Sequence, residues 1–137
     1  MRRRRRKSDC PVHFALEVLG DPWTLLIVRD VMFKARTSYT DFLRAEEGIA
    51  TNVLADRLKR LQALGLIRRR GTGRGATYAL TEKGLDLLPA MLELVSWSAR
   101  HDRQTAAPPD FVARIRRDRE AVATELRKHL RRGYGLD

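Results

Sequence analysis

Cysteine is almost absent from this sequence, since Cys10 is the single one in 137 residues. One thiol cannot close an intrachain disulfide, and no cluster of cysteines and histidines forms a structural zinc pattern. We therefore expect a reducing, cytoplasmic compartment. No run of about 18 apolar residues is present, which predicts no membrane span. The start, Met1 followed by Arg2 to Arg6 and Lys7, lacks the apolar stretch of a signal peptide.

Patterns typical of enzymes are missing as well. His13, His101 and His129 stand in separate contexts, and no paired carboxylates, nucleophile–base arrangement or phosphate-binding loop is recognisable. The glycine-rich stretch 71–75 (GTGRG) does not fit the GxGxxG fingerprint of dinucleotide-binding proteins. We therefore predict that the protein is not an enzyme and that it uses no metal and no cofactor.

Positive charge is what the sequence has in excess. The chain is 43% hydrophobic and 33% charged, enough for one domain with an extension. The 28 Lys and Arg against 17 Asp and Glu give a net charge of +11. Residues 1–7 alone carry +6, whereas residues 8–65 carry −1. This excess favours a polyanionic partner, which is DNA, RNA or an anionic membrane.

The chain divides into four parts. Residues 1–9 predict a disordered basic arm, because like charges repel one another. Residues 10–100 carry the periodic patterns of a folded domain, and residues 101–109 form a polar linker that ends in two prolines. Residues 110–137 predict a C-terminal amphipathic helix with a basic outer side, whose apolar stripe Arg119 interrupts.

Two helices are expected at the start of the domain. The first covers residues 11–19, with Pro11 in its first turn and Asp9 or Cys10 as its cap. The second covers residues 23–33, with Asp21 as its cap. This second helix is apolar nearly all round, which predicts the central helix of the core.

A short helix and a long helix follow. Thr40 is the expected cap of a helix over residues 41–46. After a turn, residues 51–64 form the best-defined helix of the chain, because leucines recur every three or four residues. Gly65 stands where the chain needs a left-handed end to this helix.

After residue 65, the spacing of apolar residues changes from the helical pattern to one typical of strands. Residues 66–70 and 76–80 predict a β-hairpin around the glycine-rich tip. Thr81 caps a final helix of the domain that reaches about Arg100, with a kink expected at Pro89. The predicted fold is therefore mainly α with a small β-hairpin, in the order of a winged helix-turn-helix.

A winged helix-turn-helix places its second helix in the major groove of DNA, which is about 12 Å wide and admits one helix. On the helix of residues 51–64, the leucines define the core side and polar residues the opposite side. We expect the groove to be contacted by Thr51, Asn52, Ala55, Asp56 and Lys59. Thr40 and Arg60 are better placed for phosphates. A merely solvated helix face is the alternative.

The hairpin predicts a second contact. Arg74 lies between glycines at its tip, where a long cationic side chain reaches a groove or phosphate. Arg68 and Arg70 share one face of their strand and Arg69 takes the other, so not all three can point at DNA. A loop that needs glycine only to turn is the alternative.

Several tracts in order carry a resemblance: CPV at 10–12, LGD at 19–21, WTLLIVRD at 23–30, YTDFL at 39–43, GI at 48–49, VLADRLKRL at 53–61, GLI at 65–67 and YALTEKG at 78–84. Over residues 10 to about 98 the chain resembles the HxlR-type transcriptional regulators of the MarR-like superfamily. The resemblance implies a homodimer that binds operator DNA as a repressor or activator. It also implies dimerisation through the N-terminal helix and the helices after the wing.

Two departures from the family pattern stand out. Pro22 replaces the usual Lys or Arg before the tryptophan, and the wing lacks its common prolines and its Glu before the tyrosine. We therefore expect a more mobile wing. The arm and the tail from His101 onward lie outside the resemblance. We expect the C-terminal helix to pack on its own dimer or to extend the interface.

Cys10 has two interpretations. In several members of the family a cysteine before this proline senses oxidants or electrophiles, and a helix N-terminus beside a basic arm favours the thiolate. Oxidation of Cys10 would give an intersubunit bond or a mixed disulfide, and an electrophile would alkylate it. The alternative is a small packing residue.

We therefore predict a homodimeric, sequence-specific repressor on a palindromic operator, with double-stranded DNA and a small-molecule or electrophile effector as partners. The competing hypothesis is a sequence-independent nucleic-acid binder, architectural or RNA-binding, because it shares the charge.

Overall fold

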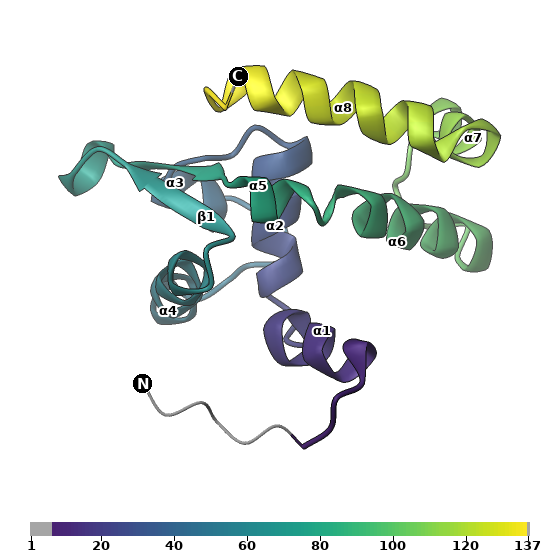
Figure 1. Ribbon diagram of the computed structural model, residues 1–137. Coiled ribbons are helices and arrows are strands. Elements are labelled where there is room, and N and C mark those ends of the chain that lie inside the picture. Colours follow the sequence, from purple (N-terminus) through teal and green to yellow (C-terminus); the bar gives the residue numbers. More distant parts are fainter. Residues whose placement is uncertain (1–6, 137) are drawn as a thin grey trace.

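The computed structural model describes residues 7–136. Its elements follow one another along the chain (Figure 1): α1 (Pro11–Leu19), α2 (Thr24–Phe33), α3 (Tyr39–Leu43), α4 (Thr51–Ala63), β1 (Ile67–Arg70), the 3-10 turn η1 (Gly73–Gly75), β2 (Thr77–Leu80), α5 (Glu82–Leu85), α6 (Leu88–His101), α7 (Pro109–Arg117) and α8 (Arg119–Gly133). The predicted fold class, mainly α with one hairpin, is confirmed. Most of the predicted basic arm lies outside the described residues.

Helix α2 is the centre of the core, as its apolar sequence predicts. Ile27, Val28 and Val31 are buried in one cluster with residues of α4, the hairpin, α5 and α6. The helix begins at Thr24 because the Asp21 carboxylate accepts hydrogen bonds from the N–H groups of Trp23 and Thr24, at 2.9 and 3.1 Å. Asp21 was expected to be the cap, but the N-cap position of α2 is Trp23, and Asp21 bonds the backbone of the turn just before the helix.

Helix α3 corrects one predicted cap. Thr40 was expected to cap residues 41–46, but Ser38 is the cap and the helix covers Tyr39–Leu43. Ser38 Oγ accepts from the N–H of Asp41 at 3.1 Å, and the Asp41 carboxylate accepts from the N–H of Ser38 at 3.2 Å. This reciprocal capping box satisfies two backbone donors, which a cap at Thr40 could not do.

The hairpin closes directly on α4. Gly65 takes a left-handed φ of 75°, and the N–H of Leu66 then bonds to the carbonyl of Leu61 at 3.0 Å. Strands β1 and β2 pair antiparallel, with Ile67 opposite Leu80 and Arg70 opposite Thr77. The N–H of Tyr78 also bonds to the carbonyl of Thr37 at 2.8 Å, which ties the hairpin to the start of α3.

Two helices differ from their predicted extent. The helix expected to be kinked by Pro89 is divided into α5 and α6, and Pro89 lies in the first turn of α6, where its missing N–H costs nothing. The expected C-terminal helix is also two helices. The chain bends at Asp118, whose side chain caps α8 by accepting from the N–H of Ala121 at 3.1 Å.

The tail helices pack on their own chain. Val112 and Ile115 of α7 and Val122 and Leu130 of α8 are buried. Figure 1 shows α7 and α8 along one side of α2, α5 and α6, and the Phe111 ring meets the Phe33 ring edge-on at 6.4 Å. Among the helices of residues 7–136, none has the length and apolar character that crossing a membrane requires.

Candidate nucleic-acid interface

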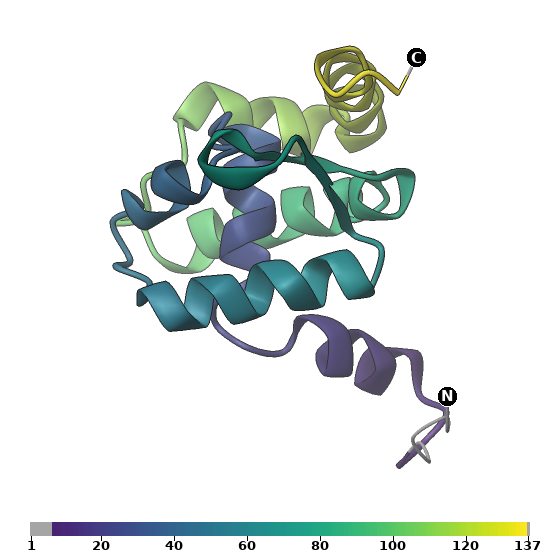
Figure 2. The same ribbon diagram turned by 90° about the vertical axis from the view of Figure 1, so that its left-hand side faces the viewer.

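One side of α4 is buried and the other is open. Leu54, Leu58 and Leu61 are at most 2% exposed, so they fix the rotation of the helix about its axis. Figure 2 looks onto the open side, with the hairpin above α4 and α1 below it. The structure brings all five groove residues to this open side, and all are exposed: Thr51, Asn52, Ala55, Asp56 and Lys59.

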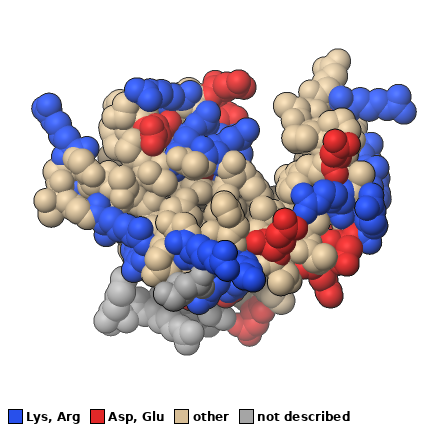
Figure 3. All heavy atoms as spheres, turned by 90° about the horizontal axis from the view of Figure 1, so that it is seen from above, with Lys and Arg blue, Asp and Glu red and all other residues tan. Residues whose placement is uncertain are grey.

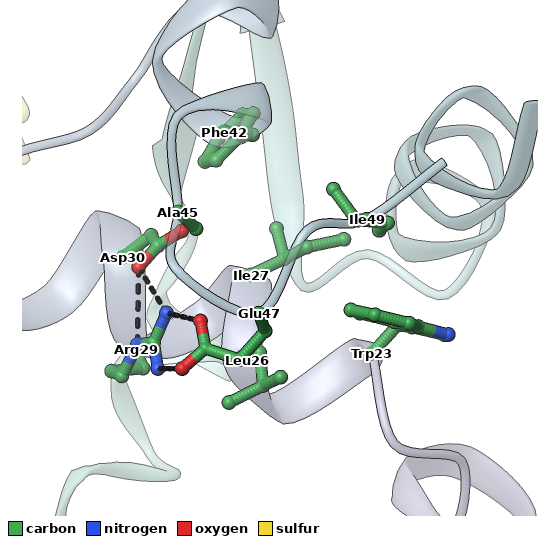
Figure 4. Close-up of a pocket in the computed structure, with 9 residues that line it drawn as sticks. All are labelled: Trp23, Leu26, Ile27, Arg29, Asp30, Phe42, Ala45, Glu47 and Ile49. Carbon is green, nitrogen blue, oxygen red and sulfur yellow. Dashed lines mark hydrogen bonds and ion pairs between the residues drawn. The ribbon is translucent and has the colours of Figure 1, made fainter. Parts of the chain in front are cut away.

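The turn between α3 and α4 is clamped to α2. Arg29 donates two hydrogen bonds to the Glu47 carboxylate, each 2.8 Å long, and further bonds to buried Asp30 (Figure 4). The hydrogen bond from Arg29 lowers the pKa of Glu47 from its usual 4.5 to about 2, so the pair stays ionised. Ile49 packs into the core after this turn. The start of α4 is thereby set relative to the core.

Arg60 lies elsewhere than predicted. Its guanidinium donates to the carbonyls of Val18 and Glu17 in the last turn of α1, at 3.1 Å for Val18. The phosphate contact stays a prediction. In the structure the Arg60 side chain instead caps a neighbouring helix, whose last carbonyls lack partners within that helix. Helical periodicity places Arg60 close to the predicted groove residues, but it does not show that α1 lies beside this side chain.

Arg57 is a second arginine of α4 that contacts the segment between α1 and α2, and the sequence pattern did not predict this role. Its Nε donates to Asp21 at 3.0 Å, and its Nη1 donates to Asp56 at 2.6 Å. Burial raises the pKa of Asp21, but hydrogen bonds from Thr24, Arg57 and the backbone outweigh it and hold this pKa well below its usual range. Asp21 thus joins the start of α2 to α4. Asp56 stays exposed while it is paired.

The wing and α3 enclose a shallow hollow. Thr40 and Arg74 lie on its walls together with Arg69, whose guanidinium donates to the carbonyl of Gly73 at 3.3 Å. The hollow is open and has a volume of about 540 Å³. Tyr39 also lines it, and its hydroxyl donates to the carbonyl of Thr51 at 3.1 Å. Arg69 and Tyr39 were not among the predicted site residues. Strand alternation was the signal for Arg69.

Arg68 and Arg70 point to the other side of β1. Both donate to the carbonyl of Tyr134 at the end of α8, over 2.9 Å for Arg68. Much of the tail's charge is also paired: Arg114 with Glu125 at 2.7 Å, and Arg127 with Asp86 at 2.8 Å. Figure 3 shows basic and acidic side chains interspersed over this face. The tail therefore offers no single basic patch there.

Cys10 lies at the N-cap of α1 and is exposed. Its thiol makes no capping hydrogen bond, and its N–H bonds to Ser8 Oγ at 3.4 Å. A reagent in solution can therefore reach the sulfur. No group of histidine, cysteine and acidic side chains within residues 7–136 is arranged to hold a metal ion.

Helices α2, α3 and α4 followed by a hairpin, with the exposed polar side of α4 beside that hairpin, define a winged helix-turn-helix protein. The chain belongs to the HxlR-like helix-turn-helix family, whose match covers residues 18–106. The resemblance seen in the sequence is confirmed. The tail after residue 106 lies outside this match.

Known relatives support this placement. The chain is 36% identical over 98 residues to the HTH-type transcriptional regulator MT3179 of Mycobacterium tuberculosis, covering 69% of this chain and 61% of that protein. It therefore spans less than two thirds of that relative. The redox regulator HypR in its reduced form matches with a TM-score of 0.60 and 28% identity, over 69% of this chain and 95% of HypR. Quinone-bound YodB from B. subtilis matches with a TM-score of 0.57 and 28% identity, over 66% of this chain and 98% of YodB.

Proposed function

We propose that this protein is a transcriptional regulator that binds a palindromic operator as a homodimer in the cytoplasm and acts as a repressor. One observation carries the proposal: the open side of α4 and the tip of the wing face the same way, and both are exposed (Figure 2). A helix and an adjacent wing in this arrangement engage the major groove and the neighbouring backbone together. The names of the relatives agree with this function.

The contacts divide by chemistry. Asn52 is suited to adenine, Lys59 to guanine or phosphate, and Asp56 to the amino group of cytosine. Ala55 can contact a thymine methyl group, and Thr51 lies at the helix start, where phosphates bind. Thr40 and Arg74 line the same hollow beside the wing, and we assign both to the backbone of one DNA strand. Arg60 is not assigned to this set, because in the structure it caps α1.

Exposed apolar side chains support the dimer. Val12 and Leu16 of α1 are 66% and 60% exposed, and Trp97 of α6 is 65% exposed. Apolar surface of this kind marks a partner site, and both helices belong to the regions that the family resemblance implies for dimerisation. A two-fold dimer presents two copies of α4, which explains a palindromic operator.

The test compares two duplexes at about 150 mM salt: one from upstream of the protein's own gene, the other of random sequence. A regulator should prefer the first by about a thousandfold or more. Asn52→Ala should lose about 1–3 kcal/mol on the operator and almost nothing on random DNA. Gln104→Ala, which removes an exposed amide of the linker, is the matched control.

The competing function is a sequence-independent nucleic-acid binder, which the net charge of +11 favours. Equal affinity for both duplexes, with Asn52→Ala unchanged on each, would support it. The near-neutral charge of residues 8–65 favours the regulator. Without an excess of positive charge, the affinity of α4 for DNA must come from specific contacts of individual side chains.

A response to oxidants or electrophiles is the second part of the proposal. The exposed Cys10 thiol at the start of α1 supports it, as do the matches to a redox regulator and to a quinone-bound protein. Diamide or a quinone should release wild-type protein from the operator and leave Cys10→Ser bound. Equal release of both proteins would exclude Cys10 as the sensor.

A further inference from the structure

The segment that follows α8, residues 134–136, contacts strand β1 of the wing. After α8, Gly135 takes a left-handed φ of 65°, and the N–H of Leu136 bonds to the carbonyl of Arg131 at 2.9 Å. The N–H of Gly135 bonds to the carbonyl of Arg132 at 3.3 Å, which completes a Schellman motif. This closure leaves the carbonyl of Tyr134 directed outward, where it accepts from Arg68 and Arg70 of β1.

The same residue is anchored on its other side. The hydroxyl of Tyr134 donates to the carbonyl of Val31 in the central helix α2. Leu136 packs against the core, and Leu130 is buried one turn before the end of α8. Tyr134 therefore links α2, by its side chain, to β1, by its backbone.

A second set of contacts fixes α8 to the segment that follows the wing. Arg127 donates to Glu82 at 3.1 Å and to Asp86 at 2.8 Å, and Arg131 also pairs with Glu82. Because Glu82 and Asp86 follow β2 directly, the last turns of α8 hold both ends of the hairpin. Figure 1 shows the last turn of α8 on the side of the hairpin that faces away from α4.

We propose that the end of α8 is a strut that sets the position of the wing, and that Arg68 and Arg70 are positioning residues rather than DNA contacts. Both guanidinium groups donate to the Tyr134 carbonyl. The cations of the wing that face the hollow, where we place DNA, are therefore Arg69 in β1 and Arg74 at the tip. The strut replaces the stiffness that the glycine-rich tip, without prolines, does not supply. It lies outside the residues that match the family.

This inference rests on the proposed contact between wing and DNA, but wing mobility tests it without DNA. A nitroxide is attached to Thr72→Cys in a Cys10→Ser background, so that the label has one site. Electron paramagnetic resonance then reports the motion of the tip. The test variants are Arg68→Gln with Arg70→Gln, and a chain ending at Arg132, which keeps the buried Val122 and Leu130.

Both test variants should shorten the rotational correlation time of the label about twofold and weaken operator binding about tenfold. Their combination should add little, because both remove the same contact. The control is Arg116→Gln with Arg117→Gln, which removes two charges from α7, at the end of the molecule away from the wing. It should leave the mobility of the label unchanged.

Unchanged mobility in both test variants would overturn the strut. Weaker DNA binding without a change in mobility would show instead that Arg68 and Arg70 contact DNA. If a double variant does not fold by circular dichroism, Gly135→Ala replaces it, since this change strains the closing turn and places a methyl group 3.4 Å from the Arg70 guanidinium. Wild-type protein without operator preference would defeat the proposed function, and the mobility measurement would still decide on the strut.

Discussion

Helices α1 and α8 are both amphipathic, yet only α8 has buried side chains within its own chain. Val122 and Leu130 of α8 are buried, whereas no residue of α1 is. Helix α1 is held by polar contacts at its C-terminal end, from Arg60, and by the half-buried Val18 and Leu19. An apolar stripe therefore predicts that a helix has a partner, but not whether the partner is the same chain.

The difference assigns separate tasks to the two ends of the chain. We assign α1 to the proposed dimer, because its Val12 and Leu16 side chains are exposed. The apolar side of α8 is buried within its own chain, so this helix can hold the wing without a second subunit. The prediction was that the C-terminal helix packs on its own dimer or extends the interface. The structure narrows it to packing on its own chain, because the buried side of α8 lies against the core.

The largest effect is expected from Leu16→Glu on α1. Leu16 is 60% exposed in the single chain, so the change should leave folding intact and place a charge in the dimer interface. The molar mass measured by light scattering should fall to that of one chain. Operator affinity should fall about 100-fold or more, because the two half-sites are no longer bound together.

Thr124→Glu is the control for this change, since it places the same charge on the exposed side of α8. It should keep the dimer and the affinity. A dimer that survives Leu16→Glu would show that α1 is not part of the interface and would remove the contrast between the two helices.

The next effect concerns α8. Leu130→Ala removes a buried side chain and should lower the free energy of unfolding by about 2–4 kcal/mol, measured by urea denaturation. Leu94→Ala on α6 is the comparison, because Leu94 is 48% exposed and should cost much less in the isolated chain. Equal losses would mean that α8 does not pack on its own chain in solution.

The fold was largely predictable because its signals are local. Leucine spacing placed α4 within one residue, and strand alternation separated Arg69 from Arg68 and Arg70. The five groove residues follow from the same periodicity, since the side of α4 opposite the leucines must face outward. These features need only knowledge of the nearest turns of the chain.

What could not be predicted depends on contacts between distant segments. Arg60 lies 43 residues from Glu17 and Arg68 lies 66 residues from Tyr134, so neither partner can be read from local spacing. The cap at Ser38 is a different case. The pattern S-x-x-D was present at residues 38–41, but Thr40 stood nearer the expected helix.

A smaller effect is expected where α1 meets α4. Arg60→Gln shortens the side chain and removes its charge, so the carbonyls of Val18 and Glu17 lose their donors. We expect a loss of about 1 kcal/mol, because the side chain is partly exposed and water can replace it. Hydrogen exchange should increase in α1 and remain unchanged in α8. Lys59→Gln, its exposed neighbour, is the control for stability.

The smallest expected effect is the pH dependence of stability from the Arg29–Glu47 ion pair. It distinguishes the contribution of this pair from that of the apolar packing around Ile49. Arg29 lowers the pKa of Glu47 from 4.5 to about 2, so this pair stabilises the fold above pH 4.5 and the contribution is lost as the pH falls toward 2. Because the Glu47 side chain is 37% exposed, solvent screening limits the contribution to about 1 kcal/mol or less. The urea midpoint of wild-type protein should fall more between pH 5 and pH 3 than that of Glu47→Gln. Parallel midpoints would show that the clamp on α4 depends on packing around Ile49 rather than on charge.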